Sequence, residues 1–212
     1  MRLSRQDILA GALDLLDEVG ADNLTMRRLA TALGVTNGAT YWHFASKQVL
    51  LAAMAESMLA GVTNGLDRDA PWWEQLTATA HRLHAALKSR RDGARIFAGA
   101  FFPEPNALAY GETMIGILRE AGMSPRDAVW TVDTITYYVV GHTIEEQAAA
   151  GLAEDDVPDL RAALDPELHP NTLAAIDDIP APHPPEHFDH GLELIISGLR
   201  TRLGVEVVSN GG

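Results

Sequence analysis

Two pairs of histidines are spaced so that a helix would bring both members of each pair to one face. His81 and His84, and also His187 and His190, lie three residues apart, and residues three apart are neighbours on a helical surface. Each pair could hold one metal ion, because imidazole nitrogen is a frequent ligand of Zn2+. The chain has no cysteine to complete such a site, and only the second pair has acidic residues close to it in sequence. We interpret these histidines as surface or pocket-lining residues and predict no metal site.

Glu145 and Glu146 place two carboxylates side by side in a segment with helical character. Neighbouring residues on a helix point about 100° apart, so this pair is poorly arranged to share acid–base chemistry. The sequence also has no Gly-x-Ser-x-Gly nucleophile elbow, no phosphate-binding loop and no dinucleotide-binding fingerprint. These observations indicate a protein that is not an enzyme. The alternative from the residues alone is a helical metal-binding or hydrolytic protein that uses His187, His190 and Glu145.

The composition is that of an ordinary globular protein. Of 212 residues, 47% are hydrophobic and 21% are charged, and none is cysteine, which excludes disulfide scaffolds, thiolate metal sites and iron–sulfur clusters. The N-terminus has no apolar signal core, and the uncharged stretch 134–144 is far shorter than the ~20 residues that span a bilayer. We therefore expect a soluble, cytoplasmic protein of one or two domains, with no membrane contact and no cofactor.

The formal net charge of −13 is distributed unevenly between residues 1–48, here called the head, and residues 49–212, here called the body. The head carries five basic and five acidic side chains, whereas the body carries 11 basic and 24 acidic ones. Between Asn23 and Ala55 there are three basic side chains and no acidic one. Such asymmetry within one chain indicates a small anion-binding module attached to an acidic body.

Periodicity and capping residues predict an all-α fold. Four helices that end near residues 20, 33, 44 and 65 begin at the caps Ser4, Thr25, Thr36 and Ser46. Further helices are expected over 71–90, 93–101, 105–121, 125–152 and 186–203. The segment 153–185 holds seven of the 11 prolines and eight acidic residues. It should form a long acidic loop with one short helix near 171–176.

The segment from Thr25 to Phe44 has the pattern of a helix-turn-helix. Ala30 provides a small residue where two steeply crossing helices touch, and Gly34 provides the positive φ that the turn needs. The residues expected on the outer face are Thr36, Asn37, Ala39, Thr40, Trp42 and His43. An exposed tryptophan is poor use of surface unless something packs on it. An ordinary αα-hairpin is the alternative that these spacings alone leave open.

Three motifs in the head and three in the body stand out. Those in the head are Leu24–Ala30, Leu33–Val35 and Tyr41–Phe44, the last followed by Lys47. Those in the body are Ser89–Arg95, Glu145–Gln147 and Gly191–Leu199. Together they resemble the tetracycline repressor family of transcriptional regulators, over nearly the whole chain and most weakly from 153 to 185. The resemblance implies a helix-turn-helix DNA-binding domain over residues 1–48 and a larger helical ligand-binding and dimerisation domain over residues 49–212.

The resemblance places the operator contacts on the second and third helices. Arg27 could reach guanine or phosphate, and Asn37 could pair with adenine. Lys47 would add charge at a helix N-terminus, where free N–H groups favour an anion. The residues implied to contact DNA are Thr25, Met26, Arg27, Asn37, Gly38, Ala39, Tyr41, Trp42, His43 and Lys47.

The implied ligand pocket departs from that of the tetracycline-binding branch of the family. There, a histidine shortly after the Asp-Gly-Ala motif binds a magnesium–drug chelate, and the matching position here is Phe97. Phenylalanine cannot ligate a hard cation, so we expect a largely apolar, aromatic pocket instead. The implied lining residues are Thr63, Thr79, Leu83, Phe97, Phe101, Met114, Trp130, Tyr137 and Glu145. Plain core packing is the alternative for the aromatic side chains.

Two helices are apolar on more than one side and are expected to form a four-helix interface between two copies. They are the helices at about 125–152 and 186–203. The stripe expected to face the partner consists of Phe188, Leu192, Ile195, Leu199 and Leu203, with Gly191 and Gly198 allowing close approach. Burial of both helices within one chain is the alternative. We therefore predict a homodimeric repressor that binds a palindromic DNA operator and is released by a small, largely apolar or aromatic organic ligand.

Overall fold

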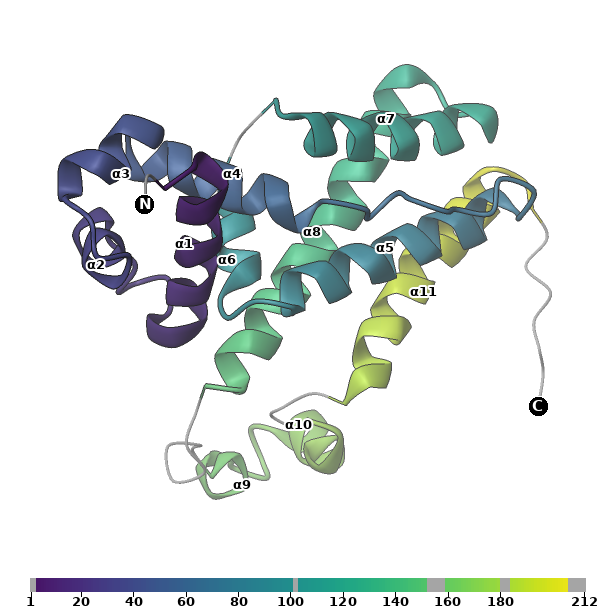
Figure 1. Cartoon of the computed structure of the whole chain (residues 1–212). Coiled ribbons are helices and arrows are strands. Elements are labelled where there is room, and N and C mark those ends of the chain that lie inside the picture. Colours follow the sequence, from purple (N-terminus) through teal and green to yellow (C-terminus); the bar gives the residue numbers. More distant parts are fainter. Residues whose placement is uncertain (1–2, 101–102, 152–158, 180–183, 206–212) are drawn as a thin grey trace.

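The computed structural model describes residues 3–100, 103–151, 159–179 and 184–205, and this part of the chain is helical with no β-strand. Three short helices gather at the N-terminus, and a larger helical body follows them (Figure 1). The first three helices are α1 (Arg5–Val19), α2 (Met26–Ala32) and α3 (Asn37–His43). The next helix, α4 (Lys47–Met58), runs from the head into the body. The all-α prediction is confirmed.

Two of the three caps predicted for α1 to α3 are formed, whereas Thr36 precedes α3 without a side-chain cap hydrogen bond. The Ser4 hydroxyl accepts a hydrogen bond from the backbone N–H of Asp7, and the Asp7 carboxylate accepts one from the backbone N–H of Ser4. The Thr25 hydroxyl accepts a hydrogen bond from a backbone N–H in the first turn of α2. Gly20 and Gly34 have φ values of 76° and 65°, which glycine adopts without steric cost. The chain can therefore turn sharply after α1 and after α2.

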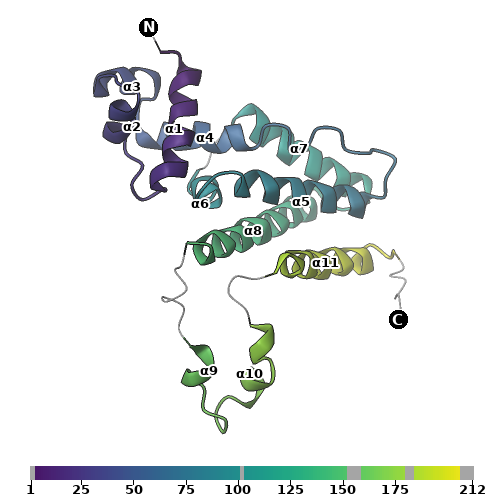
Figure 2. The ribbon, with the colours of Figure 1, turned by 60° about the horizontal axis from the view of Figure 1, so that its bottom comes forward.

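Two long helices form the centre of the body. α5 (Trp72–Lys88) and α8 (Pro125–Ala149) lie against each other, and α7 (Pro105–Glu120) packs on both (Figures 1 and 2). α11 (Pro185–Arg202) also packs on both α5 and α8. The short α6 (Gly93–Ala98) contacts α4, α5 and α8. Among the described residues, no helix is long and apolar enough to cross a membrane.

One hydrophobic core continues from the head into the body. Leu16 and Phe44 are fully buried in the head, Met54 is buried in α4, and Leu83 and Met114 are fully buried in the body. Full burial of such a side chain stabilises the fold by about 1.5–3 kcal/mol relative to exposure. Because this core is continuous, a change of packing in the body can reach the head.

The fourth helix is shorter than predicted. α4 ends at Met58, and turns replace the helix as far as residue 65. Gly61 and Gly65 have φ values of 82° and 60°, which a right-handed helix does not contain. The Arg82 guanidinium donates hydrogen bonds to the carbonyl oxygens of Asn64 and Gly65. The backbone conformation of these two glycines, which an apolar pattern does not reveal, therefore keeps the helix from continuing to residue 65.

Residues 159–179 contain more helix than predicted. α10 (Pro170–Ala174) and a short 3-10 turn (Ile176–Asp178) correspond to the expected short helix. α9 (Leu160–Ala163) is additional, and it begins where the Asp159 carboxylate accepts a hydrogen bond from a backbone N–H. Both α9 and α10 lie apart from the helices of the body (Figure 2). The other parts of the predicted loop extend into segments outside the described residues.

α11 buries its main apolar stripe within its own chain, which corrects the sequence prediction. Phe188, Leu192 and Ile196 are buried, and α11 packs on α5 and α8. The remaining members of the predicted stripe pack partly against the same core, namely Ile195, Leu199 and Leu203. Gly191 also faces its own chain, because the Tyr138 ring occupies the space that a side chain there would need. The sequence of an apolar helix indicates that its apolar faces are buried. It does not indicate whether the same chain or a second copy buries each face.

Candidate nucleic-acid interface and effector region

α3 presents most of the residues predicted to contact DNA. Asn37, Gly38, Tyr41 and Trp42 are exposed, and Trp42 leaves 70% of its surface accessible. Its ring meets the imidazole of His43 edge-on, at a centroid distance of 4.5 Å. An indole exposed to this extent supports a role in contact rather than in packing of the head.

The first turns of α2 and α4 add basic side chains to this surface. Arg27 and Lys47 are both exposed, and the sequence from 23 to 55 contains no acidic residue. Thr25 is exposed while its hydroxyl caps α2, and Ala39 and His43 are half-buried. Positive charge in such a stretch favours a polyanion such as DNA.

Met26 and Thr40 differ from the prediction. Met26 is only 5% exposed and belongs to the core, so it packs the head and is removed from the set of DNA contacts. Thr40, expected on the outer face, is fully buried, and its hydroxyl donates a hydrogen bond of 2.8 Å to the carbonyl oxygen of Asn37. These helices are each seven residues long. Two turns contain too few apolar residues for the sequence to locate the inner face accurately.

Ion pairs connect α1 with the segment that leads into α6. The Arg90 guanidinium lies 2.6 Å from the Asp17 carboxylate, which also accepts a hydrogen bond of 2.8 Å from a backbone N–H. Arg95 donates two hydrogen bonds to Asp22, at 2.8 and 3.2 Å, and these bonds lower the pKa of the Asp22 carboxyl. Each of these pairs is accessible to water and stabilises little alone. Together they fix the orientation of α1 on α6.

The turn between α5 and α6 is held from two sides. Asp92 has a φ of 55°, which is uncommon for a residue other than glycine, and its carboxylate accepts a hydrogen bond of 2.7 Å from the Ala21 N–H. Gly93 lies so close to the Leu87 carbonyl that a Cβ would not fit. From α8, the Gln147 amide donates to two carbonyl oxygens of this turn and accepts a hydrogen bond from the first turn of α6. The turn therefore links the head to α8.

α4 also forms hydrogen bonds with the body at two points. The Gln48 amide donates a hydrogen bond of 2.8 Å to the carbonyl oxygen of Gly99, at the end of α6. The Glu56 carboxylate accepts hydrogen bonds from the backbone N–H groups of Asn106 and Ala107, at 2.6 and 3.1 Å, in the first turn of α7. A displacement of α6 or α7 would move α4, which leads directly into the head.

The predicted pocket residues divide by burial. Thr79 and Leu83 of α5 and Met114 of α7 are fully buried, and these two helices pack against each other. Thr63 and Phe97 are partly buried, and Phe97 packs on the core from α6. These five residues come from α5, α6, α7 and the segment that follows α4. They are compatible with an interior ligand site that is mainly apolar.

The other predicted pocket residues are not part of this interior group. Trp130 and Tyr137 are 54% and 71% exposed, and Glu145 is exposed further along α8. The Arg126 guanidinium lies 4.1 Å from the centroid of the Trp130 ring. A single chain therefore does not bring these three residues into its interior. Phe101 lies outside the described residues.

Histidines that the sequence pairs along helices are instead paired across helices. His84 of α5 contacts Glu146 of α8, and His142 of α8 contacts His187 of α11. The sequence reasoning missed His142, although its spacing of four residues from Glu146 was a usable signal. Glu145 and His190 are exposed. The alternative site of His187, His190 and Glu145 is therefore not assembled as a buried centre.

Comparison with known proteins supports the same organisation. Residues 8–54 match the family described as bacterial regulatory proteins, tetR family, and residues 64–203 match the family described as tetracyclin repressor-like, C-terminal domain. The tetracycline repressor protein class A from transposon 1721 of Escherichia coli is 40% identical over 203 residues. That alignment covers 95% of this chain and 92% of the relative.

Solved structures show the same fold. A possible TetR family transcriptional regulator from Streptomyces coelicolor A3(2) has 42% identity and a TM-score of 0.86, covering 94% of this chain and 100% of that one. A TetR variant from Acinetobacter baumannii AYE in complex with minocycline has 36% identity and a TM-score of 0.73, covering 95% and 98%. BioQ with its double-stranded DNA operator has 32% identity and a TM-score of 0.70, covering 94% and 99%. The chain belongs to the tetracycline repressor family of bacterial transcriptional regulators.

Proposed function

We propose that this protein is a homodimeric repressor that binds a palindromic operator and leaves it when a small, largely apolar ligand binds. In this proposal residues 1–48 read the DNA, and residues 49–212 bind the ligand and the second subunit. The similar structures of BioQ with its operator and of a TetR variant with minocycline support DNA binding and ligand binding on this fold.

The observation that carries the proposal is the outer face of the head. Asn37, Tyr41 and Trp42 are exposed on α3, with Arg27 and Lys47 exposed on the adjoining helices. A recognition helix of this kind lies in the major groove, where Asn37 and Arg27 can distinguish base pairs. Lys47 and Tyr41 suit phosphate contacts, which fix the register without reading sequence.

A second copy is needed because one seven-residue recognition helix reads few base pairs. The exposed residues Trp130, Thr134, Tyr137 and Gly141 recur every three or four positions along α8, which places them on one face. On α11, Leu194 is 64% exposed and Gly198 has open space around it. Exposed apolar residues gathered on two neighbouring helices are typical of a subunit interface. These faces replace the buried stripe of α11 as the proposed contact.

Release is proposed to act through α6. Phe97 lies on this helix, and the contacts of Asp92 with Ala21 and of Gly99 with Gln48 join both of its ends to the head. A ligand that displaces Phe97 would change these contacts and tilt α4. The segment Ala100–Pro103, proposed as the lever, directly follows, and its residues 101 and 102 lie outside the described residues.

The energy required for release favours an apolar ligand. Shifting a two-state equilibrium from 99:1 to 1:99 requires ~5.5 kcal/mol of differential affinity. At ~25 cal/mol per Å2, roughly 200 Å2 of additional apolar burial in the released state would supply it. Leu83 and Met114 are buried apolar side chains and Phe97 packs on the same core, and none of the three can ligate a hard cation. An aromatic or polycyclic compound with few charges fits this requirement.

The operator test is selection of DNA from a random library by the purified protein, followed by fluorescence anisotropy. We expect an inverted repeat whose half-sites lie about one helical turn apart or somewhat more. The Kd should be in the nanomolar range at moderate salt and should rise steeply with salt concentration. Enrichment of no inverted repeat, with equal affinity for all sequences, would contradict the proposal.

A further inference from the structure

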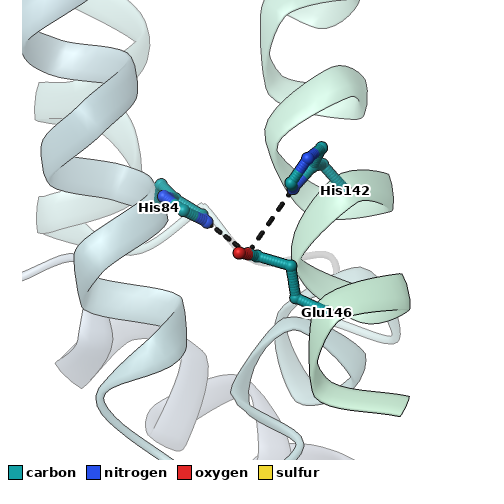
Figure 3. A group of neighbouring side chains, drawn as sticks. All are labelled: His84, His142 and Glu146. Carbon is teal, nitrogen blue, oxygen red and sulfur yellow. Dashed lines mark hydrogen bonds and ion pairs between the residues drawn. The ribbon is translucent and has the colours of Figure 1, made fainter. Parts of the chain in front are cut away.

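Three side chains from α5 and α8 converge beside the core of the body (Figure 3). Nε2 of His84 lies 2.5 Å from Oε2 of Glu146, and Nδ1 of His142 lies 3.5 Å from the same oxygen. One nitrogen or oxygen from each residue lies within 4.8 Å of the other two. The side chains are only 14%, 13% and 6% exposed, for His84, Glu146 and His142 respectively. The cluster is therefore shielded from water on most sides.

His142 has one nitrogen that forms no hydrogen bond, although that nitrogen lies near the Glu146 carboxylate. Its Nε2 lies 3.0 Å from Nδ1 of His187, whereas its Nδ1 is buried and forms no hydrogen bond. Burial lowers the pKa of His142, which favours the neutral ring. When the single proton lies on Nε2 and is donated to His187, the lone pair of Nδ1 faces the Glu146 carboxylate. Two lone pairs facing each other repel, and a cation between them removes the repulsion.

The surroundings hold the other two groups in place. The Phe188 ring stacks on His84 at a centroid distance of 4.0 Å. Lys88 Nζ lies 3.0 Å from Oε1 of Glu146, which leaves Oε2 turned toward the histidines. Burial acts to raise the pKa of Glu146, but the hydrogen bonds from His84 and Lys88 outweigh burial and lower that pKa. The carboxylate is therefore ionised and preorganised.

We propose that His84, His142 and Glu146 bind a divalent transition metal ion of the zinc class. Two imidazole nitrogens and one carboxylate oxygen suit Zn2+, Co2+ and Ni2+, whereas Mg2+ and Ca2+ prefer oxygen ligands. Bonds of about 2.0–2.2 Å place tetrahedral ligand atoms about 3.3 Å apart, so small side-chain rotations suffice. His187 is the outer partner that fixes the proton of His142 on Nε2. Water completes the coordination.

The metal has a route from solvent. Glu146 and Lys88 line an open cleft of about 760 Å3 between the end of α1, the α5–α6 turn and the end of α8. The ligands join α5 to α8, and His187 connects them to α11. The metal would therefore stabilise the contact of three body helices. This site does not include Phe97 and does not depend on the proposed DNA or inducer binding.

The test uses untagged, full-length protein from which metal has been removed by a chelator. Calorimetric titration with ZnCl2 should show one ion per chain, and CoCl2 should give visible absorption bands of a nitrogen- and oxygen-ligated ion. His84→Ala and Glu146→Gln should each weaken Zn2+ binding by more than about a hundredfold. His190→Ala should leave binding unchanged, because His190 is an exposed histidine of α11 outside the cluster.

Two variants distinguish ligation from folding. Glu146→Gln keeps the size and one acceptor oxygen, which can serve either Lys88 or His84, so weaker Zn2+ binding with an unchanged circular dichroism spectrum identifies the carboxylate as a ligand. Lys88→Gln should strengthen binding, because it removes a cation that lies 3.0 Å from the carboxylate. The proposal is overturned by the absence of saturable Zn2+ binding, by equal Mg2+ binding, or by binding that survives both His84→Ala and Glu146→Gln.

Discussion

The head and the body use the same element, the amphipathic helix, but place their functional residues differently. In the head, side-chain caps begin α1 and α2, positive-φ glycines follow them, and the expected DNA contacts point away from the core. In the body, the chemically notable residues lie where α5, α8 and α11 meet. The function of the head depends on an exposed surface, whereas the functions proposed for the interior of the body depend on helix packing. The four predictions that follow test this contrast.

The largest effect is expected where the body should meet a second copy. Tyr137→Asp would place an unpaired carboxylate in the exposed stripe of α8, and its burial in a dimer would cost about 3–5 kcal/mol. The variant should sediment as a monomer and bind the operator more than about a hundredfold more weakly. Leu168→Asp is the matched control, because Leu168 is 74% exposed and lies between α9 and α10. A Tyr137→Asp variant that remains dimeric would show that the subunit contact lies elsewhere. A wild-type protein that is monomeric at micromolar concentration would show that the contact does not form.

A smaller effect is expected for ligand release after Phe97→Ala. Loss of about 100 Å2 of aromatic contact would weaken ligand binding by about 2.5 kcal/mol. A much higher ligand concentration should therefore be needed to release the operator, while operator affinity without ligand stays unchanged. Aromatic and polycyclic compounds, tetracycline included, can be screened for operator release by anisotropy, with and without excess chelator. Operator release should be the same with and without chelator. In the control variant Leu108→Ala, whose side chain is 60% exposed on α7, the ligand should release the operator as in wild type. Release that requires magnesium would show that the pocket works as in the tetracycline-binding branch.

Within the head, single contacts should have moderate effects. Arg27→Ala or Asn37→Ala should cost ~1–3 kcal/mol of operator binding and relax specificity at one base pair. Lys47→Ala should weaken binding to all sequences alike. Met26→Leu should keep the sequence preference, because Met26 is buried and such a substitution changes packing by less than about 1.5 kcal/mol. Operator binding by both the Arg27 and Asn37 variants at wild-type strength would exclude this surface as the reading face.

The smallest effect concerns ionisation in the body core. Burial raises the pKa of Tyr110 to about 12, although its hydroxyl lies 2.9 Å from that of Thr136. Since the unfolded side chain ionises near pH 10, the folded state keeps a proton that the unfolded state loses, and stability falls as pH rises from about 10 to 12. From pH 8 to pH 11, the free energy of unfolding measured with denaturant should fall by about 1 kcal/mol less in Tyr110→Phe than in wild type. Tyr41→Phe, at an exposed position of the head, should match wild type; identical losses in all three proteins would disprove the assignment.

The local features of the head were predictable from sequence because they depend on neighbouring residues. The capping box of Ser4 with Asp7, the Thr25 cap and the turn glycines Gly20 and Gly34 all involve residues within a few positions of each other. The burial of Met26 and Thr40 was not predictable, because it depends on how α2 and α3 cross. Sequence thus specifies where these short helices begin more reliably than which way they face.

The body shows the opposite balance. The apolar character of α8 and α11 was correctly identified, but the direction of Phe188 and Gly191 depends on where α11 docks on α5 and α8. The contact between His84 and Glu146 spans 62 positions in the sequence. No local spacing encodes such a contact. The histidine cluster, and the exposed faces on which the dimer is proposed, could therefore be located only in the fold.

The charged junction between α1 and α6 gives ionic strength a second route of action. The pairs of Asp17 with Arg90 and of Asp22 with Arg95 are accessible to solvent, and added salt weakens ion pairs of this kind. Added salt would make the release of counterions from the DNA less favourable, and it would also allow the heads to rotate relative to the body. The slope of log affinity against log salt would then exceed the number of phosphates that the heads contact. Part of the salt dependence of operator affinity would then come from the charged junction between α1 and α6, which does not touch DNA.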